Sequence, residues 1–399
     1  MQQNIKRIIT FTGGIETLSF FSEQLRSTFQ KMGYLVFPYD LKGDEKQFRR
    51  LKKFLKVGET AMLTFNFQGL GGEDYLFSKQ YGYIWQQFKI PCYNIVVDHP
   101  FYYQDYMFQL PPEYHQISID RYHEAYVKKY YKNVKTAGFL PHAGTQMIPE
   151  AEQLPIKERP LEVVMTGNYT SLAECEPYFH LINEEYAAFY HGIGDRMLKT
   201  RELPLEDVMH DMVTEEIGDV SDTQFAEVMN KARFIDLYLR CYTRGKCVSA
   251  LVDQDIRVHV FGDGWEKLDC KKKQNLIITR EISSEECLKK LGEAKISLSV
   301  MPWFRDGAHD RIFNSILNGA LCVTDHSIYL DEIFTGDEVG FFDIGKLEEL
   351  PDMVKELLAD ENRMQQMADE ARKKVEKDHT WAARAAALRQ LFEGQEMVV

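Results

Sequence analysis

The stretch DGAHDRIFNSILNGALCVTD, residues 306–325, decides the fold that the sequence predicts. Its first half is rich in ionisable side chains and continues with helical spacing, whereas its second half, ALCVTD, is an apolar run that indicates a buried strand. Asn318-Gly319 between the halves is typical of a helix end. Charged residues just ahead of a helix that leads into a core strand are typical of an α/β unit, in which the loops after strands hold the ligand.

The same alternation of β-rich runs and helical patterns covers the whole chain, which indicates βαβ units and parallel sheets. A first series of strands is predicted at residues 7–13, 34–41, 61–67, 93–99, 115–120 and 136–142. A second series is predicted at residues 161–171, 258–265, 276–280, 296–303, 320–325 and 339–343. Helices are expected between the strands, notably at Glu16 to Lys31, at residues 72–89 and over the last ~45 residues.

A chain of 399 residues is too long for one core, since cores stop growing at about 250 to 300 residues. We therefore predict an α/β protein with two Rossmann-like, doubly wound parallel-sheet domains. The first spans residues 1–148, a polar, proline-bearing linker spans 149–160, and the second spans 161–378. Residues of about 172–250 have helical spacing and are predicted to form a helical insertion, or an elaborated crossover, in the second domain.

Composition excludes several classes of protein. The formal charge of -13 argues against wide contact with nucleic acid, but leaves room for a local basic pocket. Neither a signal-peptide core nor an apolar run of ~18 residues is evident, which predicts a cytoplasmic protein without a transmembrane segment. The seven cysteines form no CxxC pair, so they suggest neither a disulfide framework nor a zinc site.

Two loops of the first series contain candidate residues. Gly13 and Gly14 precede a helix, where a backbone can approach a ligand and free amides attract an anion. The alternative is a tight turn without a ligand, because Glu16 already complements the helix dipole. Asp98 and His99 lie at the end of the fourth strand and could act as general base or position a substrate hydroxyl, unless they lie in a bend imposed by the next proline.

In the second series, Gly167, Asn168 and Tyr169 lie where the first strand passes into a loop. Glycine allows close approach and the polar side chains offer hydrogen bonds, although helix capping would explain them equally well. The turn that begins at Gly262 resembles a nucleotide-binding turn but lacks the full GxGxxG pattern.

A capping box formed by Ser283 and Glu286 fixes where the next helix starts. Arg280 and Ile282 therefore lie in a loop at the carboxyl edge of the sheet, where backbone groups can read a flat base.

The opening stretch follows the same scheme, with a helix that starts near Asp310. Amides at that helix start can hold a diphosphate, and neighbouring guanidinium and imidazole groups can add positive charge. The alternative is a charged helix start with normal capping and no ligand. The candidate residues of this loop and helix are Arg305, Asp306, Gly307, Ala308, His309, Asp310, Arg311 and Asn314.

One pattern in this stretch resembles the C-terminal domain of GT-B glycosyltransferases, in the group-1-type, spore-maturation (CgeB-like) branch. The pattern consists of Asp306, seven residues, Asn314, the segment SILNG and a core strand. The resemblance extends back through HVFGDGW and LIITREISSEECLKKLGEAKISLSVMPW and forward to DHTWAARAAALRQLF. It covers about residues 161–392, with a looser match through TFTGG and VVDHPFYY.

This resemblance implies two domains that face a cleft, with a last helix (379–399) that packs back on the first. It implies that Asp306 contacts donor-sugar hydroxyls and Asn314 the ribose, while residues 307–309 meet the sugar and diphosphate. The family has glutamates at the positions of Asp306 and Asn314. Asparagine is not a charge-assisted acceptor, so the donor should bind more weakly or be unusual. No cofactor or metal is expected, since GT-B members generally need none and no DxD metal motif is evident.

The resulting hypothesis is a bacterial glycosyltransferase that moves a hexose, with retention, from a UDP- or GDP-linked sugar to a glycan, protein or small molecule. Asp98, His99 and Asp306 are its catalytic candidates. The insertion could shape acceptor choice or form a homodimer contact; within it, residues 234–247 are either a packed helix or a partner surface. The rival hypotheses are an inactive scaffold protein of a surface or spore layer and a dinucleotide-dependent oxidoreductase.

Overall fold

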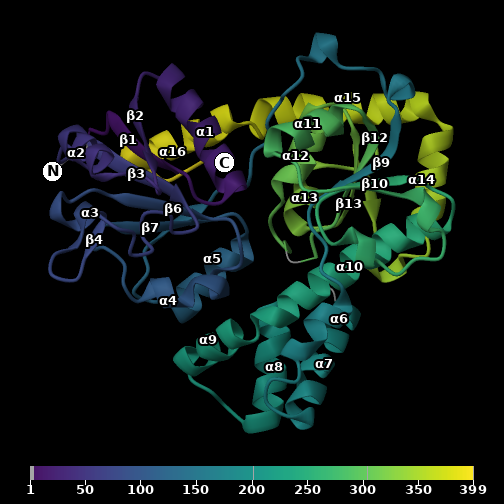
Figure 1. The fold of residues 1–399 in the computed structure, drawn as a ribbon, viewed down its shortest axis with the longest axis horizontal. Coiled ribbons are helices and arrows are strands. Elements are labelled where there is room, and N and C mark those ends of the chain that lie inside the picture. The colour runs from purple at the N-terminus through teal and green to yellow at the C-terminus, as the bar shows by residue number, and fades with distance from the viewer. Residues whose placement is uncertain (1–3, 201, 303, 399) are drawn as a thin grey trace. The chain divides into compact units, whose positions relative to one another are not determined.

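The computed structural model describes residues 4–200, 202–302 and 304–398. The chain divides into two compact units: unit 1 comprises Met1–His142 with Thr380–Val399, and unit 2 comprises Ala143–His379. Each unit contains one six-stranded parallel sheet with helices around it (Figure 1). The prediction of two doubly wound α/β domains is thereby confirmed.

The sheet of unit 1 has the strand order β2-β1-β3-β6-β7-β8. Its strands are β1 (Arg7–Thr12), β2 (Leu35–Asp40), β3 (Thr60–Phe65), β6 (Cys92–Val96), β7 (Tyr114–Ser118) and β8 (Thr136–Phe139). Its helices are α1 (Glu16–Lys31), α2 (Glu45–Phe54), α3 (Ile84–Gln87), α4 (Gln104–Met107), α5 (Arg121–Tyr130) and α16 (Trp381–Phe392). The chain order reverses between β1 and β3, which is the switch point of this sheet.

The last helix belongs to unit 1, although it is the most distant part of the chain in sequence. Phe392 at its end lies 5.7 Å from Phe29 of α1, and Trp381 at its start lies 5.4 Å from Phe21 of the same helix, both measured between ring centroids. These apolar contacts explain why α16 packs on α1, the arrangement that the resemblance implied for the last helix.

The helix expected at residues 72–89 is wrong. These residues form a short hairpin, β4 (Phe77–Ser78) and β5 (Gly82–Tyr83), followed by the single-turn helix α3. Gly82 turns the chain with a φ of 68°, and the indole of Trp85 is fully buried and donates to the carbonyl of Gly69 at 2.8 Å. Long-range burial of the aromatic side chains therefore outweighed the local helical spacing.

The sheet of unit 2 has the strand order β11-β10-β9-β12-β13-β14. Its strands are β9 (Leu161–Thr166), β10 (Val258–Phe261), β11 (Leu276–Thr279), β12 (Ala294–Ser299), β13 (Leu321–Asp325) and β14 (Gly340–Phe342). In chain order this is 3-2-1-4-5-6, the dinucleotide-binding order, with its switch point between β9 and β12.

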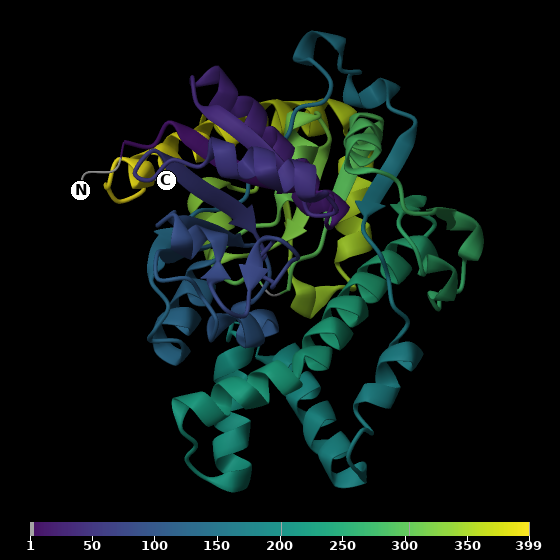
Figure 2. The same cartoon turned by 60° about the vertical axis from the view of Figure 1, so that its left-hand side comes forward.

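The expected helical insertion is confirmed between β9 and β10 and extends away from the sheet of unit 2 (Figures 1 and 2). It consists of α6 (Leu172–Cys175), α7 (Glu184–Lys199), α8 (Leu205–Ile217), α9 (Asp222–Lys231) and α10 (Arg233–Asp253). The remaining helices of unit 2 are α11 (Ser284–Gly292), α12 (Asp310–Leu317), α13 (Ile328–Ile333), α14 (Leu350–Ala359) and α15 (Glu361–Asp378).

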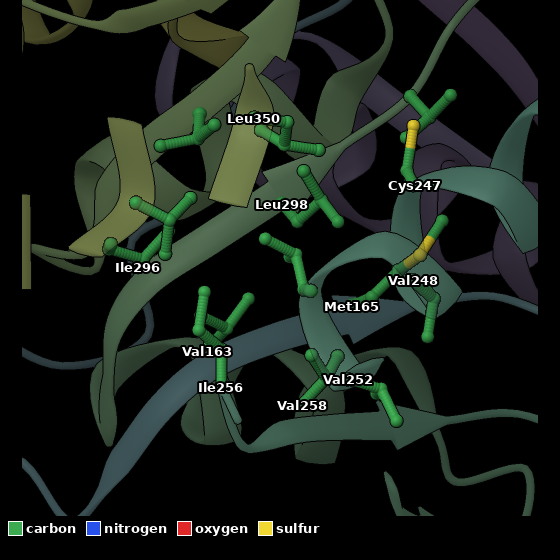
Figure 3. Close-up of a cluster of buried hydrophobic side chains, with 14 of the residues drawn as sticks. Val163, Met165, Cys247, Val248, Val252, Ile256, Val258, Ile296, Leu298 and Leu350 are labelled. Atoms are coloured by element: carbon green, nitrogen blue, oxygen red, sulfur yellow. The ribbon is translucent and has the colours of Figure 1, made fainter. Parts of the chain in front are cut away.

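The core of unit 2 lies between one face of its sheet and helices α10 and α14 (Figure 3). Alternate residues of the strands, such as Val163 and Met165 of β9, point into it, as do Val248 and Val252 of α10. The second half of the insertion's longest helix is thus part of the core, which fixes where the first half lies.

The strands are confirmed, but most of them end one to five residues earlier than expected. Strands β9 and β10 stop at Thr166 and Phe261, because Gly167 and Gly262 have φ angles of 123° and 155° that take the chain out of the sheet. The strand expected at 296–303 ends at Ser299, and Trp303 lies outside the described residues. Among the described helices, none combines the length and the apolar character that crossing a membrane requires.

Candidate functional site

At the carboxyl ends of β9 and β10 two loops interlock. Asp263 donates its backbone N–H to the side-chain oxygen of Asn168 at 2.9 Å, and Tyr169 donates its own to the carbonyl of Asp263 at 2.9 Å. A Cβ on Gly262 would lie 2.4 Å from the carbonyl oxygen of Gly167, and one on Gly264 would lie even closer to that of Tyr169. Two glycines of the GDGW turn therefore serve the packing of this loop pair.

A cavity of about 800 Å³ opens beside these loops, at the carboxyl ends of β9, β10 and β11. It brings together four residues that the sequence predicted for the donor: Asn168, Tyr169, Gly262 and Arg280. The exposed side chain of Ile278 adds an apolar wall. Ile282, the fifth residue predicted for this edge, is half-buried in the loop just after β11 and is not part of the lining.

Two guanidinium groups meet at the switch point, next to this cavity. The point where a Cβ on Gly167 would lie is 3.6 Å from Nη1 of Arg311, at the start of α12, and 3.9 Å from Nη1 of Arg244, on α10. Arg244 also donates to the carbonyl of Asn168 at 3.3 Å. Gly167, whose loop lines the switch point, thus lies against positive charge from two helices that are far apart in sequence.

The electrostatics of the two arginines indicate a site for an anion. Burial lowers the pKa of Arg244 to about 9, and the guanidinium of Arg311 contributes to this shift. Burial also lowers the pKa of Arg311. Among the described residues, neither group has an ion pair within 4 Å, and Nε of Arg244 and Nη2 of Arg311 are buried without a hydrogen-bond partner. Buried polar groups are normally satisfied, so an anionic ligand would complete this site.

The next arginine on α10 is different. Arg240, one turn before Arg244, is paired at 2.6 Å with the buried carboxylate of Asp236. Its charge is compensated inside the insertion, whereas those of Arg244 and Arg311 remain available for a ligand.

The loop between β12 and α12 contains the residues on which the sequence analysis relied most. Gly307 and Ala308 are buried, and Asp306 is half-buried. Nδ1 of His309 lies 2.5 Å from the carboxylate of Asp310. Burial lowers the pKa of His309, and Arg311 lowers it further. The neutral imidazole is therefore favoured at neutral pH, and the positive charge comes from the guanidinium groups.

Asn314 is only 7% exposed and its amide is engaged on both sides. Its Nδ2 donates to Asp310 at 2.8 Å, and its Oδ1 accepts from the backbone N–H of Thr145 at 2.8 Å. Asn318, one turn later, accepts from Met147 at 2.9 Å. Both asparagines thus fasten residues 143–148 to α12 in this structure, and contact of Asn314 with a ribose stays a prediction.

Arg305 lies apart from the arginine pair. It lines a separate cavity of about 320 Å³ at the ends of β13 and β14, together with the buried Asp325. Burial raises the pKa of Asp325 to about 6, although the carboxylate accepts the backbone N–H of Met301 at 2.8 Å. The structure therefore separates Arg305 from the pair formed by Arg244 and Arg311, and contact of Arg311 with a diphosphate stays a prediction.

In unit 1 the predicted residues lie at two places along the carboxyl edge of the sheet. Gly13 and Gly14 follow β1 at the switch point, where a Cβ on Gly13 would collide with the carboxylate of Asp40. The φ of 78° at Gly13 therefore favours glycine whether or not a ligand binds there. Asp98 and His99 follow β6, one strand beyond β3.

Asp98 and His99 are held by their surroundings. Asp98 accepts from Nδ2 of Asn66 at 2.9 Å and from the hydroxyl of Tyr103 at 2.8 Å. The imidazole of His99 is 8% exposed, and its ring centroid lies 4.6 Å from that of His123 and 4.8 Å from that of Tyr126. Such a fixed pair can position a substrate, and it can equally serve the core of unit 1.

Two residues near these strand ends, Arg244 and Asn66, were not predicted from the sequence. Arg244 lies in the mixed aromatic and basic segment 234–247, whose spacing showed a helix but not which face meets the sheet. Asn66 and Phe67 adopt φ angles of 45° and 62° at the end of β3, an unusual conformation for consecutive non-glycine residues that is often found at functional sites. No local sequence signal could have identified either position.

Comparisons with known proteins concern the family and the fold. A family model described as glycosyl transferase-like matches residues 240–390. No curated protein sequence matches the chain.

Several solved structures are similar over nearly their whole length. Sucrose-phosphate synthase from Thermosynechococcus elongatus has a TM-score of 0.56 at 12% identity, with 98% of both chains covered. The T4 phage beta-glucosyltransferase in complex with UDP-glucose has a TM-score of 0.53 at 13% identity, with 97% of this chain and 99% of the other covered. An alpha-glucosyltransferase in complex with UDP-glucose and DNA containing an abasic site has a TM-score of 0.56 at 10% identity, with 98% and 99% covered. At these identities the similarity establishes the fold, which is the two-domain α/β fold of GT-B proteins.

Proposed function

We propose that this protein is a glycosyltransferase that uses a nucleotide-diphosphate sugar as donor and binds the donor on unit 2. The observation that carries the proposal is the convergence of Arg244 and Arg311 on Gly167 at the switch point of the sheet, beside a cavity of about 800 Å³. A doubly wound sheet binds nucleotides at this position. The solved structures with this fold include proteins in complex with UDP-glucose.

In the proposed complex the base and ribose occupy the cavity and the diphosphate contacts the two guanidinium groups. Transfer of the sugar leaves a nucleoside diphosphate, whose charge increases as the glycosidic bond breaks. Fixed cations that are already desolvated stabilise such charge without reorganisation. Since Arg244 and Arg311 supply this charge, we propose that transfer does not require a divalent metal; activity with and without added Mg²⁺ tests this point.

We further propose that unit 1 supplies contacts to the acceptor, with Asp98 and His99 as its candidates. The transferred group is proposed to be a hexose moved with retention, and Asp306 is the candidate for contacting its hydroxyls. The same proposal includes membership of the CgeB-like branch and a cytoplasmic location in a bacterium. A glycan, a protein or a small molecule is the proposed acceptor.

Nucleic acid is not the proposed acceptor, although one of the similar structures contains DNA. The formal charge of -13 opposes wide contact with a polyanion. Binding of labelled DNA by the protein in 150 mM salt would contradict this part of the proposal.

The experiment that tests the proposal measures nucleotide release and binding together. The protein is incubated with UDP-, GDP-, CDP- and dTDP-linked sugars, and the released nucleoside diphosphate is quantified. We expect release with at least one donor and binding of the matching diphosphate. Binding without release under any condition would favour the scaffold hypothesis, and binding of a nicotinamide dinucleotide would favour an oxidoreductase.

A further inference from the structure

The helical insertion holds a carboxylate and two imidazoles that face one another. Glu176 begins a single 3-10 turn after α6, His180 follows that turn, and His191 lies on α7. Oε1 of Glu176 is 3.0 Å from Nε2 of His180 and 2.8 Å from Nε2 of His191. One ligand atom from each of the three side chains lies within 4.8 Å of the other two.

The packing of His191 fixes the direction of its ring. The imidazole stacks on Phe179 with a centroid distance of 4.3 Å and an interplanar angle of 10°. Phe179 is itself fully buried. The ring of His191 therefore cannot turn freely, and its Nε2 atom is held toward Glu176.

A second carboxylate orients His180. Oε1 of Glu184 lies 3.1 Å from Nδ1 of His180, on the opposite side of the ring from Glu176. A carboxylate at Nδ1 stabilises the tautomer with hydrogen on Nδ1, which leaves the lone pair of Nε2 directed at Glu176 and His191. This carboxylate–histidine arrangement is the usual outer support of a histidine that binds a metal.

Two of the three donor-atom spacings are close to those of a metal site, and the two imidazole ligand atoms are at most 4.8 Å apart. In a tetrahedral zinc site with bonds of about 2.0 to 2.1 Å, neighbouring ligand atoms are about 3.3 to 3.4 Å apart. The two Glu176–histidine distances of 2.8 and 3.0 Å are shorter by a few tenths of an ångström, a change that side-chain rotation can supply.

We propose that Glu176, His180 and His191 bind a divalent transition-metal cation, with zinc as the metal. Two imidazoles and one carboxylate are a known zinc ligand set, and they leave a fourth position for water. Nitrogen ligands disfavour Mg²⁺ and Ca²⁺, which prefer oxygen. The site lies in the insertion and does not depend on the proposed transferase activity.

The metal would fasten a weakly packed segment. Between the ligands, Phe179 is buried, whereas Tyr178, Leu181 and Ile182 are 50%, 71% and 60% exposed, so Phe179 is the main anchor of this stretch. A cation shared by Glu176, His180 and His191 links the segment to α7. The site therefore supports the structure of the insertion.

The test uses the untagged, full-length protein after removal of metal with a chelator. Isothermal titration with ZnCl₂ at pH 7.5 is expected to show one equivalent per chain and much weaker binding of MgCl₂. His191→Ala should abolish the tight site. His210→Ala is the matched control, since His210 lies in the same insertion and contacts the ring of Phe225 instead. Unchanged zinc binding by His191→Ala would overturn the proposal.

Glu184→Gln separates the metal site from a simple loss of folding. It keeps all three ligands and removes only the carboxylate behind His180, so we expect zinc binding to weaken about 10- to 100-fold at unchanged stoichiometry. Cys287, which is partly exposed, is a competing zinc ligand, and Cys287→Ser should bind zinc as the parent does. Equal affinity of the parent and Glu184→Gln, or loss of binding in Cys287→Ser alone, would show that zinc binds elsewhere.

Discussion

Replacing Arg244 by glutamine should weaken nucleotide binding and, at the same time, leave the unliganded protein at least as stable as before. The two Nη1 atoms lie 3.6 and 3.9 Å from one point above Gly167, so they are at most about 7.5 Å apart. At an effective dielectric constant of about 20, two like charges at about 7.5 Å repel each other by about 2 kcal/mol. The substitution removes this repulsion.

The same substitution also removes one hydrogen bond of the unliganded protein and one contact to the nucleotide. Loss of the hydrogen bond from Arg244 to the carbonyl of Asn168 costs about 1 kcal/mol, so the net change in the free energy of unfolding is about +1 kcal/mol without ligand. Loss of a charge-assisted hydrogen bond to the diphosphate should weaken binding by about 1 to 3 kcal/mol, or roughly 5- to 150-fold in Kd. Affinity and stability are thus expected to change in opposite directions.

The assay combines urea denaturation of the unliganded protein with calorimetric titration of UDP and GDP. Lys246→Gln is the matched control, because Lys246 is exposed on the same helix with its Nζ 5.6 Å from the ring of Tyr242. Arg311→Gln should behave like Arg244→Gln. If Arg244→Gln destabilises the protein while its affinity equals that of Lys246→Gln, Arg244 is a structural residue and the reasoning fails.

Three further predictions concern single residues. Asp325→Asn should stabilise the protein increasingly as pH rises from about 4 to 6, since burial raises the pKa of Asp325 from 3.8 to about 6 and the native state binds the proton more tightly than the unfolded state. The full difference is about 3 kcal/mol, and a difference between variant and parent that is constant across pH in urea denaturation would contradict it. His99→Ala should lower transfer without changing diphosphate affinity, because the donor is proposed to bind on unit 2; equal loss of both, measured by kinetics and titration, would mean that His99 is structural. Gly262→Ala should destabilise the protein by about 1 to 3 kcal/mol, because its Cβ would lie 2.4 Å from the Gly167 carbonyl at a φ of 155°. Gly336→Ala, where no atom lies within 4 Å, should be close to neutral; urea denaturation of both variants measures the difference.

Local patterns in the sequence were sufficient for most of the secondary structure. Helix α12 starts at Asp310 and ends just before Asn318-Gly319, as the opening stretch predicted, because Gly319 takes a φ of 80°. Helix α11 starts after Ser283 because the capping box with Glu286 forms. These features depend on hydrogen bonds and backbone preferences within a few residues, so they can be read from neighbouring positions.

The hairpin at residues 77–83 shows where local patterns fail. The aromatic residues there have helical spacing, yet burial of Trp85 against the loop at Gly69 decides their conformation. That contact joins positions 16 residues apart and has no signature in the stretch itself.

The sequence by itself determined two α/β domains, an insertion and a carboxyl edge at which to search for a site. Only the tertiary structure decided which charges meet at that edge: Arg244 of α10 joins Arg311 of α12 above Gly167, whereas Arg305 lies in another cavity and Asn314 fastens residues 143–148. The physical reason is that periodicity gives the spacing of side chains along a helix, but the direction of each side chain depends on how the whole helix packs against the sheet.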